Sequence, residues 1–206
     1  MRRDDPEDED GVLPGMIGLD ERFDDNALVD ALQLGYPVVH IASHFRFVPG
    51  NERDSFLLLG SGKRLTLEQV NVEDYNFGAV DLLTLSACET AMGGAGADGK
   101  EVEGFGTLAQ KRGAKGVLAT LWSVADESTG AFMRQMYRFR AEERLSKAEA
   151  IRRTQLAFIR GDAVAGGEGD RDRGVGVAAE GDQANLKAPY AHPYYWAPFI
   201  LMGNWL

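Results

Sequence analysis

The chain has 206 residues, of which 44% are hydrophobic and 26% charged, so it is long enough for one domain with a real core and too short for two. Its net charge of −10, with no cluster of Lys and Arg, argues against a nucleic-acid backbone as the main partner. No apolar run approaches membrane-spanning length, and no apolar segment follows the arginines at the start. We therefore expect a cytoplasmic protein that binds neither nucleic acid nor a membrane.

Much of the negative charge lies at the start of the chain, where residues 1–10 contain six acids and two arginines. This composition predicts a disordered acidic tail, followed by a single domain over residues 11–206. The first helix is predicted to begin at a cap formed by Asp25 or Asn26 and to end at Gly35, because apolar residues recur between them at helical spacing.

A strand is predicted over residues 38–42, which are apolar and rich in β-branched side chains. Residues 45–54 contain proline, glycine and asparagine and are predicted to form a loop. Two short strands are predicted over 56–59 and 63–66, and the glycine-rich turn that joins them indicates a hairpin. A short helix is expected over residues 66–70.

The rest of the chain alternates between strand and helix patterns. The predicted elements are strands over 80–85, 116–121 and 198–202 and helices over 101–111, 126–140 and 146–159, the last with Ser146 and Glu149 in capping-box spacing. Residues 161–187 contain seven glycines, six acids and few large apolar groups, which indicates a flexible insertion. Trp196 and Trp205 are expected to pack around the last strand. This alternation is typical of an α/β fold with a mainly parallel sheet.

Two of these strands end at residues that carry chemistry. Cys88, the only cysteine, follows the strand over 80–85, and His44 follows the strand over 38–42. Adjacent parallel strands would bring both to the carboxyl end of the sheet. A thiol attacks a carbonyl as thiolate, and imidazole is the usual base near neutral pH, so the pattern predicts a Cys88 nucleophile with His44 as its base. The alternatives are a small buried cysteine at a strand end and a loop histidine satisfied by the backbone.

Six short motifs occur in order: residues 40–45 (HIASHF), 57–59 (LLL), 85–90 (LSACET), 113–117 (GAKGV), 121–126 (LWSVAD) and 192–199 (HPYYWAPF). They resemble the CHAT peptidases, caspase-like relatives of separase often found in bacterial proteins beside helical repeats. The resemblance implies a caspase-like three-layer α/β/α sandwich and a cysteine endopeptidase with a dyad of His44 and Cys88. It implies a protein or peptide substrate, a helical-repeat (TPR-like) region or partner chain, and no metal or organic cofactor.

One position departs from the pattern of caspase-like enzymes, which usually have glycine directly after the catalytic histidine. This chain has Phe45 there. Because a backbone donor survives any side chain, the resemblance still implies an oxyanion hole formed by the N–H groups of Phe45 and Cys88. The bulk of the Phe45 ring is expected to narrow the cleft.

Three further residues near these strand ends are candidates for a substrate pocket: Glu89, Trp122 and Asp126. Trp122 either stacks on a substrate side chain or fills the core. Asp126 either caps the next helix, its plainer role, or lines the pocket, or does both, and in the pocket it would favour a basic substrate residue through charge pairing. Glu89 either orients a group in the cleft or faces solvent.

The remaining polar candidates have plainer interpretations. His40 lies in a strand pattern rather than a helix, so it is predicted to be a core residue or an orienter of the dyad rather than a metal ligand. His192 is expected to pack or to cap. Residues 93–99 lack the Gly-Lys-Ser/Thr ending of a phosphate loop, which favours a mobile active-site flap over a nucleotide site.

The segment before residue 38 is short for a caspase-like sheet, so one or two N-terminal strands are expected to be missing. Two hypotheses from different classes follow. The first is the endopeptidase described above. The second is a truncated or non-catalytic CHAT interaction module that binds a partner through its exposed sheet edge.

Overall fold

The computed structural model describes residues 12–48, 50–72, 75–86, 100–122, 124–162 and 188–206, with only the backbone of residues 100–103. The predicted acidic tail, the glycine loop and nearly all of the predicted insertion therefore lie outside the described residues. By its internal contacts the chain divides into two compact units, Met1–Ser123 with Phe199–Leu206, and Val124–Pro198.

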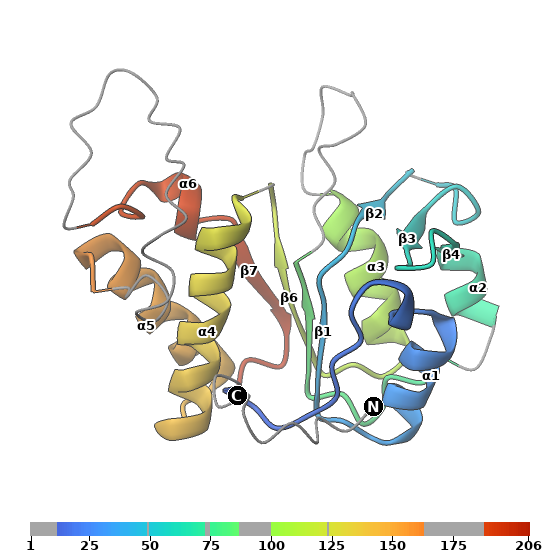
Figure 1. Cartoon of the computed structure of the whole chain (residues 1–206), viewed down its shortest axis with the longest axis horizontal. Coiled ribbons are helices and arrows are strands. Elements are labelled where there is room, and N and C mark those ends of the chain that lie inside the picture. Colours follow the sequence, from blue (N-terminus) through green and yellow to red (C-terminus); the bar gives the residue numbers. More distant parts are fainter. Residues whose placement is uncertain (1–11, 49, 73–74, 87–99, 123, 163–187) are drawn as a thin grey trace. The chain divides into compact units, whose positions relative to one another are not determined.

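The first unit is built on a four-stranded sheet with the order β1-β5-β6-β7. Its strands are β1 (Val38–Ile41), β5 (Leu82–Leu85), β6 (Gly116–Thr120) and β7 (Phe199–Gly203). β1, β5 and β6 are parallel, and β7 runs antiparallel to β6 (Figure 1). A mainly parallel sheet with helices between its strands confirms the α/β class and is consistent with a three-layer α/β/α sandwich.

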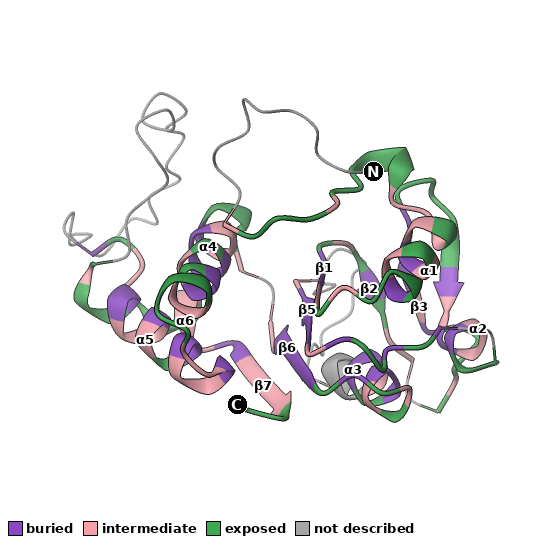
Figure 2. Ribbon diagram, turned by 90° about the horizontal axis from the view of Figure 1, so that it is seen from below, coloured by how far each residue is buried: buried purple, intermediate pink, exposed green. Residues whose placement is uncertain are grey.

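The burial of each strand agrees with the hydrophobic pattern from which the strand was predicted. Every residue of β5 and β6 is buried, as expected for central strands covered on both faces (Figure 2). In β1 the burial alternates, because Val39 and Ile41 face the core and His40 is exposed.

Three helices of the first unit are α1 (Asp25–Gln33), α2 (Leu67–Val72) and α3 (Lys100–Lys111), and a 3-10 turn, η1 (Asp20–Arg22), precedes α1. Leu28 and Leu32 of α1 and Phe105 and Leu108 of α3 are buried in the same hydrophobic cluster as alternate residues of β1, β5 and β6. These helices therefore cover one face of the sheet, where α1 and α3 appear in Figure 1.

A second, three-stranded antiparallel sheet contains β2 (Phe45–Arg46), β3 (Phe56–Leu58) and β4 (Arg64–Thr66). β3 and β4 form the predicted hairpin. The prediction of a continuous loop over residues 45–54 was wrong at its first two residues. They pair with β3, and the Leu58 N–H donates to the His44 carbonyl at 2.8 Å. Such a two-residue strand is specified by its partner rather than by its own pattern.

The helix caps test the predicted starts of two helices. α1 begins one or two residues earlier than predicted, because the cap is Asp24 and neither Asp25 nor Asn26. The Asp24 Oδ1 accepts from the Ala27 N–H at 2.8 Å. Ser146 caps its helix as predicted.

The second unit consists of α4 (Asp126–Glu142), α5 (Lys147–Arg160) and α6 (Pro193–Trp196). Its core contains aromatic contacts, including Phe132 against Phe158 at 5.4 Å between ring centroids and Phe158 against Tyr190 at 5.5 Å. His192 caps α6, as its Nδ1 accepts from the Tyr194 N–H at 3.2 Å. Among the described helices of both units, none is long and apolar enough to span a bilayer.

Candidate active site

The carboxyl ends of β1 and β5 form the site that the motifs predict. The two strands pair in parallel from Val38 opposite Leu82 to Ile41 opposite Leu85. The Ser86 N–H then donates to the Ile41 carbonyl at 3.0 Å, which continues the pairing one residue beyond β5. The two chain segments therefore leave the sheet side by side.

His44 lies three residues beyond β1 and is exposed. Its backbone is held by β3, because its carbonyl accepts from the Leu58 N–H at 2.8 Å and the neighbouring Ser43 hydroxyl donates to the Leu58 carbonyl. The small sheet thus fixes the backbone that carries this imidazole while its side chain stays accessible.

Phe45 does not place its ring in a cleft. The side chain is 5% exposed and meets Phe105 of α3 edge to face, with 5.5 Å between ring centroids. The expectation that its bulk narrows the cleft is wrong, because the ring is part of the core. Hydrogen-bonded and non-hydrogen-bonded pairs alternate along antiparallel strands. Because His44 and Leu58 form a hydrogen-bonded pair, the next pair, Phe45 and Leu57, is not hydrogen-bonded, and the Phe45 N–H points away from β3.

His40 and Ser86 connect the ends of the two strands. The His40 Nε2 and the Ser86 Oγ are 2.8 Å apart, a hydrogen bond between side chains of β1 and of the segment that follows β5. His40 is partly exposed to solvent, so of its two predicted roles the core residue is wrong, and the orienter of the dyad stays a prediction. The imidazole is nevertheless surrounded by enough protein to lose much of its hydration, which lowers its pKa from 6.5 to about 4. His40 is therefore neutral near pH 7.

The sequence of the chain matches the model of the CHAT domain family over residues 13–204. The chain belongs to the CHAT domain family. No curated protein matches it. The resemblance inferred from the short motifs is thereby confirmed over most of the chain.

The other predicted site residues of the CHAT domain are only partly placed. Cys88 and Glu89 lie outside the described residues, so the structure does not test the dyad. Trp122 is half-buried in the bend after β6. Asp126 is the exposed first residue of α4 and does not cap it, because Ala125 occupies the cap position and α4 has no side-chain cap. The two residues belong to different units.

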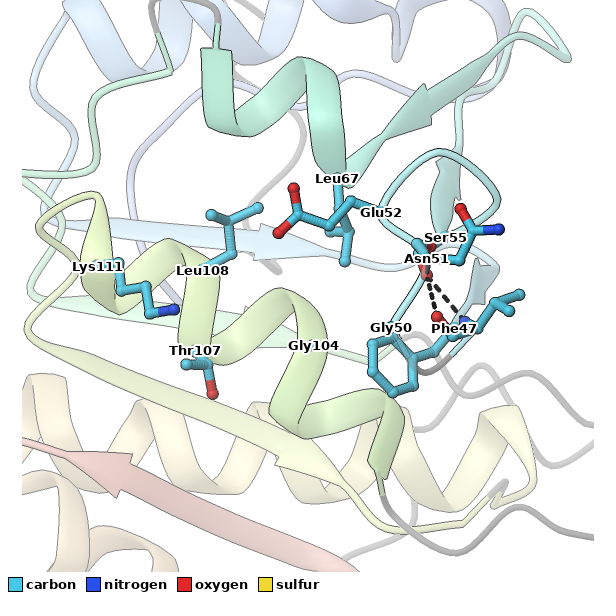
Figure 3. Close-up of a pocket in the computed structure, with 11 residues that line it drawn as sticks. Phe47, Gly50, Asn51, Glu52, Ser55, Leu67, Gly104, Thr107, Leu108 and Lys111 are labelled. Carbon is cyan, nitrogen blue, oxygen red and sulfur yellow. Dashed lines mark hydrogen bonds between the residues drawn. The ribbon is translucent and has the colours of Figure 1, made fainter.

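A pocket of about 390 Å³ opens in the first unit of the CHAT domain, between the loop after β2 and helix α3. Its lining combines apolar, polar and charged residues (Figure 3): Phe47, Val48, Gly50, Asn51, Glu52, Ser55, Leu67, Gly104, Thr107, Leu108 and Lys111. The loop wall is held by the fully buried Ser55, whose hydroxyl accepts from the Val48 N–H at 2.8 Å and donates to the carbonyl of Asn51 at 2.8 Å.

Sequence reasoning missed this pocket, because its walls come from three separate segments. The single local signal is Gly104 in the middle of an amphipathic helix, where glycine is unfavourable. A Cβ atom there would lie 2.5 Å from the Phe47 ring, so the glycine allows the ring to rest against α3. Within the described ranges, no group of three or more His, Cys, Asp or Glu residues is arranged to hold a metal ion.

Proposed function

We propose that this CHAT domain is a cysteine endopeptidase in which His44 and Cys88 form the catalytic dyad. The register of β1 and β5 carries the proposal. Every pair in that register is offset by the same number of residues, 82 − 38 = 44, and the two proposed catalytic residues are also 88 − 44 = 44 residues apart. Two residues separated by the register offset follow their paired parallel strands by the same number of residues. The register therefore supports the proposal that the thiol and the imidazole lie close together.

The proposed reaction uses only side chains and backbone of the chain. His44 accepts the thiol proton, and the Cys88 thiolate attacks the carbonyl carbon of the scissile peptide bond. The resulting oxyanion is held by the N–H groups of Phe45 and Cys88. The C–N bond then breaks, the leaving amine takes the proton from His44, and a thioester remains. Water attacks the thioester with His44 as base, which releases the carboxylic acid and restores the thiol.

Two features of the described site support these roles. The exposed His44 side chain is accessible to a peptide. The Phe45 N–H points away from β3, so the small sheet does not use this donor, and the buried ring anchors the backbone that presents it. An anchored donor needs little reorganisation when charge develops on the substrate, which is the condition for effective oxyanion stabilisation.

The substrate and its surroundings follow from the same proposal. Trp122 and Glu89 are proposed to line the pocket for the side chain before the scissile bond. The single cysteine cannot form an internal disulfide, which fits a reducing compartment, and we propose that the protein is cytoplasmic.

A second candidate function is a non-catalytic interaction module. The observation that favours it is the position of β1, which stands at one end of the sheet among the described strands. An exposed strand edge can pair with a strand of another chain or of a helical-repeat region.

Labelling with a library of peptide acyloxymethyl ketones separates the two functions. The wild type is compared with Cys88→Ala and His44→Ala. Covalent labelling at Cys88 that depends on His44 is expected, and the reactive library members identify the preferred side chain. If no member labels a protein that is folded by circular dichroism, the endopeptidase is rejected in favour of the interaction module.

A further inference from the structure

We infer that His40 and Ser86 are positioning residues, whose hydrogen bond ties the ends of β1 and β5 together and so sets the distance between His44 and Cys88. This inference rests on the proposed function, because it assigns a role in the same dyad to two residues that do not react with substrate.

The two side chains lie on the same face of the sheet. His40 is opposite Thr84 in the parallel register. Side chains two residues apart in a strand share a face, so Ser86 follows Thr84 on the face of His40. The bond of 2.8 Å between Nε2 and Oγ is therefore a diagonal contact across neighbouring strands.

Ser86 is held to β1 at two points. Its backbone N–H donates to the Ile41 carbonyl at 3.0 Å, and its side chain bonds His40. It lies two residues before Cys88, at the last described position of that segment. Two attachments fix both the position and the rotation of the backbone there, whereas the backbone bond alone would leave the segment free to pivot.

The partner segment is anchored in a similar way. His40 belongs to β1, and four residues later the His44 carbonyl accepts from the Leu58 N–H at 2.8 Å. The path from one catalytic residue to the other thus runs through β3, β1, the His40 bond and Ser86. Catalysis by a nucleophile and its base is sensitive to misplacements of about 1 Å, so a link in this path has kinetic consequences.

The neutral state of His40 argues against a competing role as the base. The surrounding protein removes much of the hydration of the partly exposed imidazole and lowers its pKa to about 4, so His40 is neutral at pH 7. Such a weak base is poorly matched to a cysteine thiol. What remains for His40 is hydrogen bonding, with Nε2 either accepting from the Ser86 hydroxyl or donating to it.

Alkylation of Cys88 by iodoacetamide as a function of pH tests this role without a substrate. Because the chain has one cysteine, the modified fraction measured by mass spectrometry reports on Cys88 alone. In the wild type we expect half-maximal reactivity at a pH below about 8.5, the value of an ordinary thiol, and His44→Ala should raise this midpoint.

Both positioning variants, His40→Phe and Ser86→Ala, should raise the midpoint by about one unit, which lowers the rate near pH 7 about tenfold. Ser86→Thr keeps the hydroxyl and should restore the wild-type midpoint. Thr66→Ala is the matched control. Its hydroxyl accepts from the Gln69 N–H at 3.1 Å, away from these strand ends, so its loss should lower the melting temperature and leave the midpoint unchanged. If His40→Phe fails to fold, the midpoint of Ser86→Ala tests the positioning role, because this variant removes only a single hydroxyl.

The results separate the two proposals. A midpoint that rises in His44→Ala but stays unchanged in His40→Phe and Ser86→Ala overturns the positioning role and leaves the dyad intact. A midpoint that stays unchanged even in His44→Ala overturns the dyad, and the positioning role with it. A rise of equal size in Thr66→Ala shows that loss of stability alone moves the midpoint, which also overturns the positioning role.

Discussion

Gly113 approaches Gly78 so closely that a Cβ atom at position 113 would lie 2.8 Å from the Gly78 Cα. This contact joins the turn after α3 to the segment that leads into β5. The Phe77 N–H donates to the Arg112 carbonyl at 3.0 Å, and the Arg112 guanidinium donates to the Tyr75 carbonyl at 3.1 Å. The start of β5 is thereby fixed against the helix that precedes β6, and with it the level at which β5 ends.

The first prediction concerns this contact. Gly113→Ala should lower the free energy of unfolding by about 2 to 4 kcal/mol, because the added methyl group clashes with the Gly78 backbone and because φ at position 113 is +110°. Gly130→Ala in α4 is the matched control, since its Cβ would meet nothing nearer than the Arg134 guanidinium at 3.5 Å. It should stabilise the protein by about 1 kcal/mol through helix propensity. Denaturant unfolding measures both, and equal effects would contradict the prediction.

The second prediction is a pH dependence of stability. The pKa of His40 is about 4 in the folded protein and about 6.5 in the unfolded chain, so the unfolded chain binds the proton first. The contribution of neutral His40 is therefore fully present above pH 6.5 and is lost as the pH falls towards 4. Since the imidazole is partly open to solvent, we expect a loss of about 1 kcal/mol rather than the full value for such a shift.

Denaturant unfolding of the wild type and His40→Gln between about pH 4 and about pH 7 measures this contribution. Other titrating groups are common to both proteins, so the difference between their stability curves isolates His40. The variant should show the shallower slope. Parallel curves would mean that the imidazole keeps its ordinary pKa in the folded protein.

The third prediction separates neighbouring cap candidates. Asp24→Ala should lower the free energy of unfolding by about 1 kcal/mol, because it removes the oxygen that accepts from the Ala27 N–H at 2.8 Å. Asn26→Ala should change stability by less than about 0.5 kcal/mol, since residue 26 lies inside α1 and alanine favours a helix. Thermal and denaturant unfolding measure both variants, and a larger loss for Asn26→Ala would reverse the assignment of the cap.

The sequence predicted the elements that are specified by local patterns. Its predictions were wrong where contacts between distant segments determine the structure. β5 and β6 are continuous apolar runs, and the cap at Ser146 is a short local motif, so both were predictable. Adjacent Asp24 and Asp25 have the same chemistry, and only the start of the helix distinguishes them. Trp205, predicted to pack, is 60% exposed, because a tryptophan near a strand does not itself indicate which side is covered.

In the candidate site, too, local features were predictable from the sequence and contacts between distant segments were not. The motif order placed His44 just after β1 and predicted the family that the match over residues 13–204 confirms. The His40–Ser86 bond, in contrast, depends on strand register, which the sequence does not display. The pocket beside α3 depends on the approach of Phe47 to Gly104. Both features arise from contacts between segments far apart in the chain, and so required the structure.

The fourth prediction tests whether Phe45 acts through its backbone or its ring. Phe45→Leu keeps an apolar side chain in the core and leaves the N–H in place. It should lower the free energy of unfolding by about 1 to 2 kcal/mol, because the ring that meets Phe105 at 5.5 Å is replaced by a smaller group. The rate of Cys88 labelling by the best ketone should stay within about twofold of the wild type, since the proposed oxyanion donor is unchanged.

Phe45→Ala provides the companion measurement, with a larger stability loss of about 3 to 5 kcal/mol from the cavity it leaves around a side chain that is 5% exposed. Labelling is compared at a temperature where each variant is folded by circular dichroism. If Phe45→Leu is folded and labels more than about tenfold more slowly, a difference of about 1.4 kcal/mol in the barrier, the ring itself shapes the cleft. An unchanged rate in both folded variants would leave the backbone amide as the part of Phe45 that matters for catalysis.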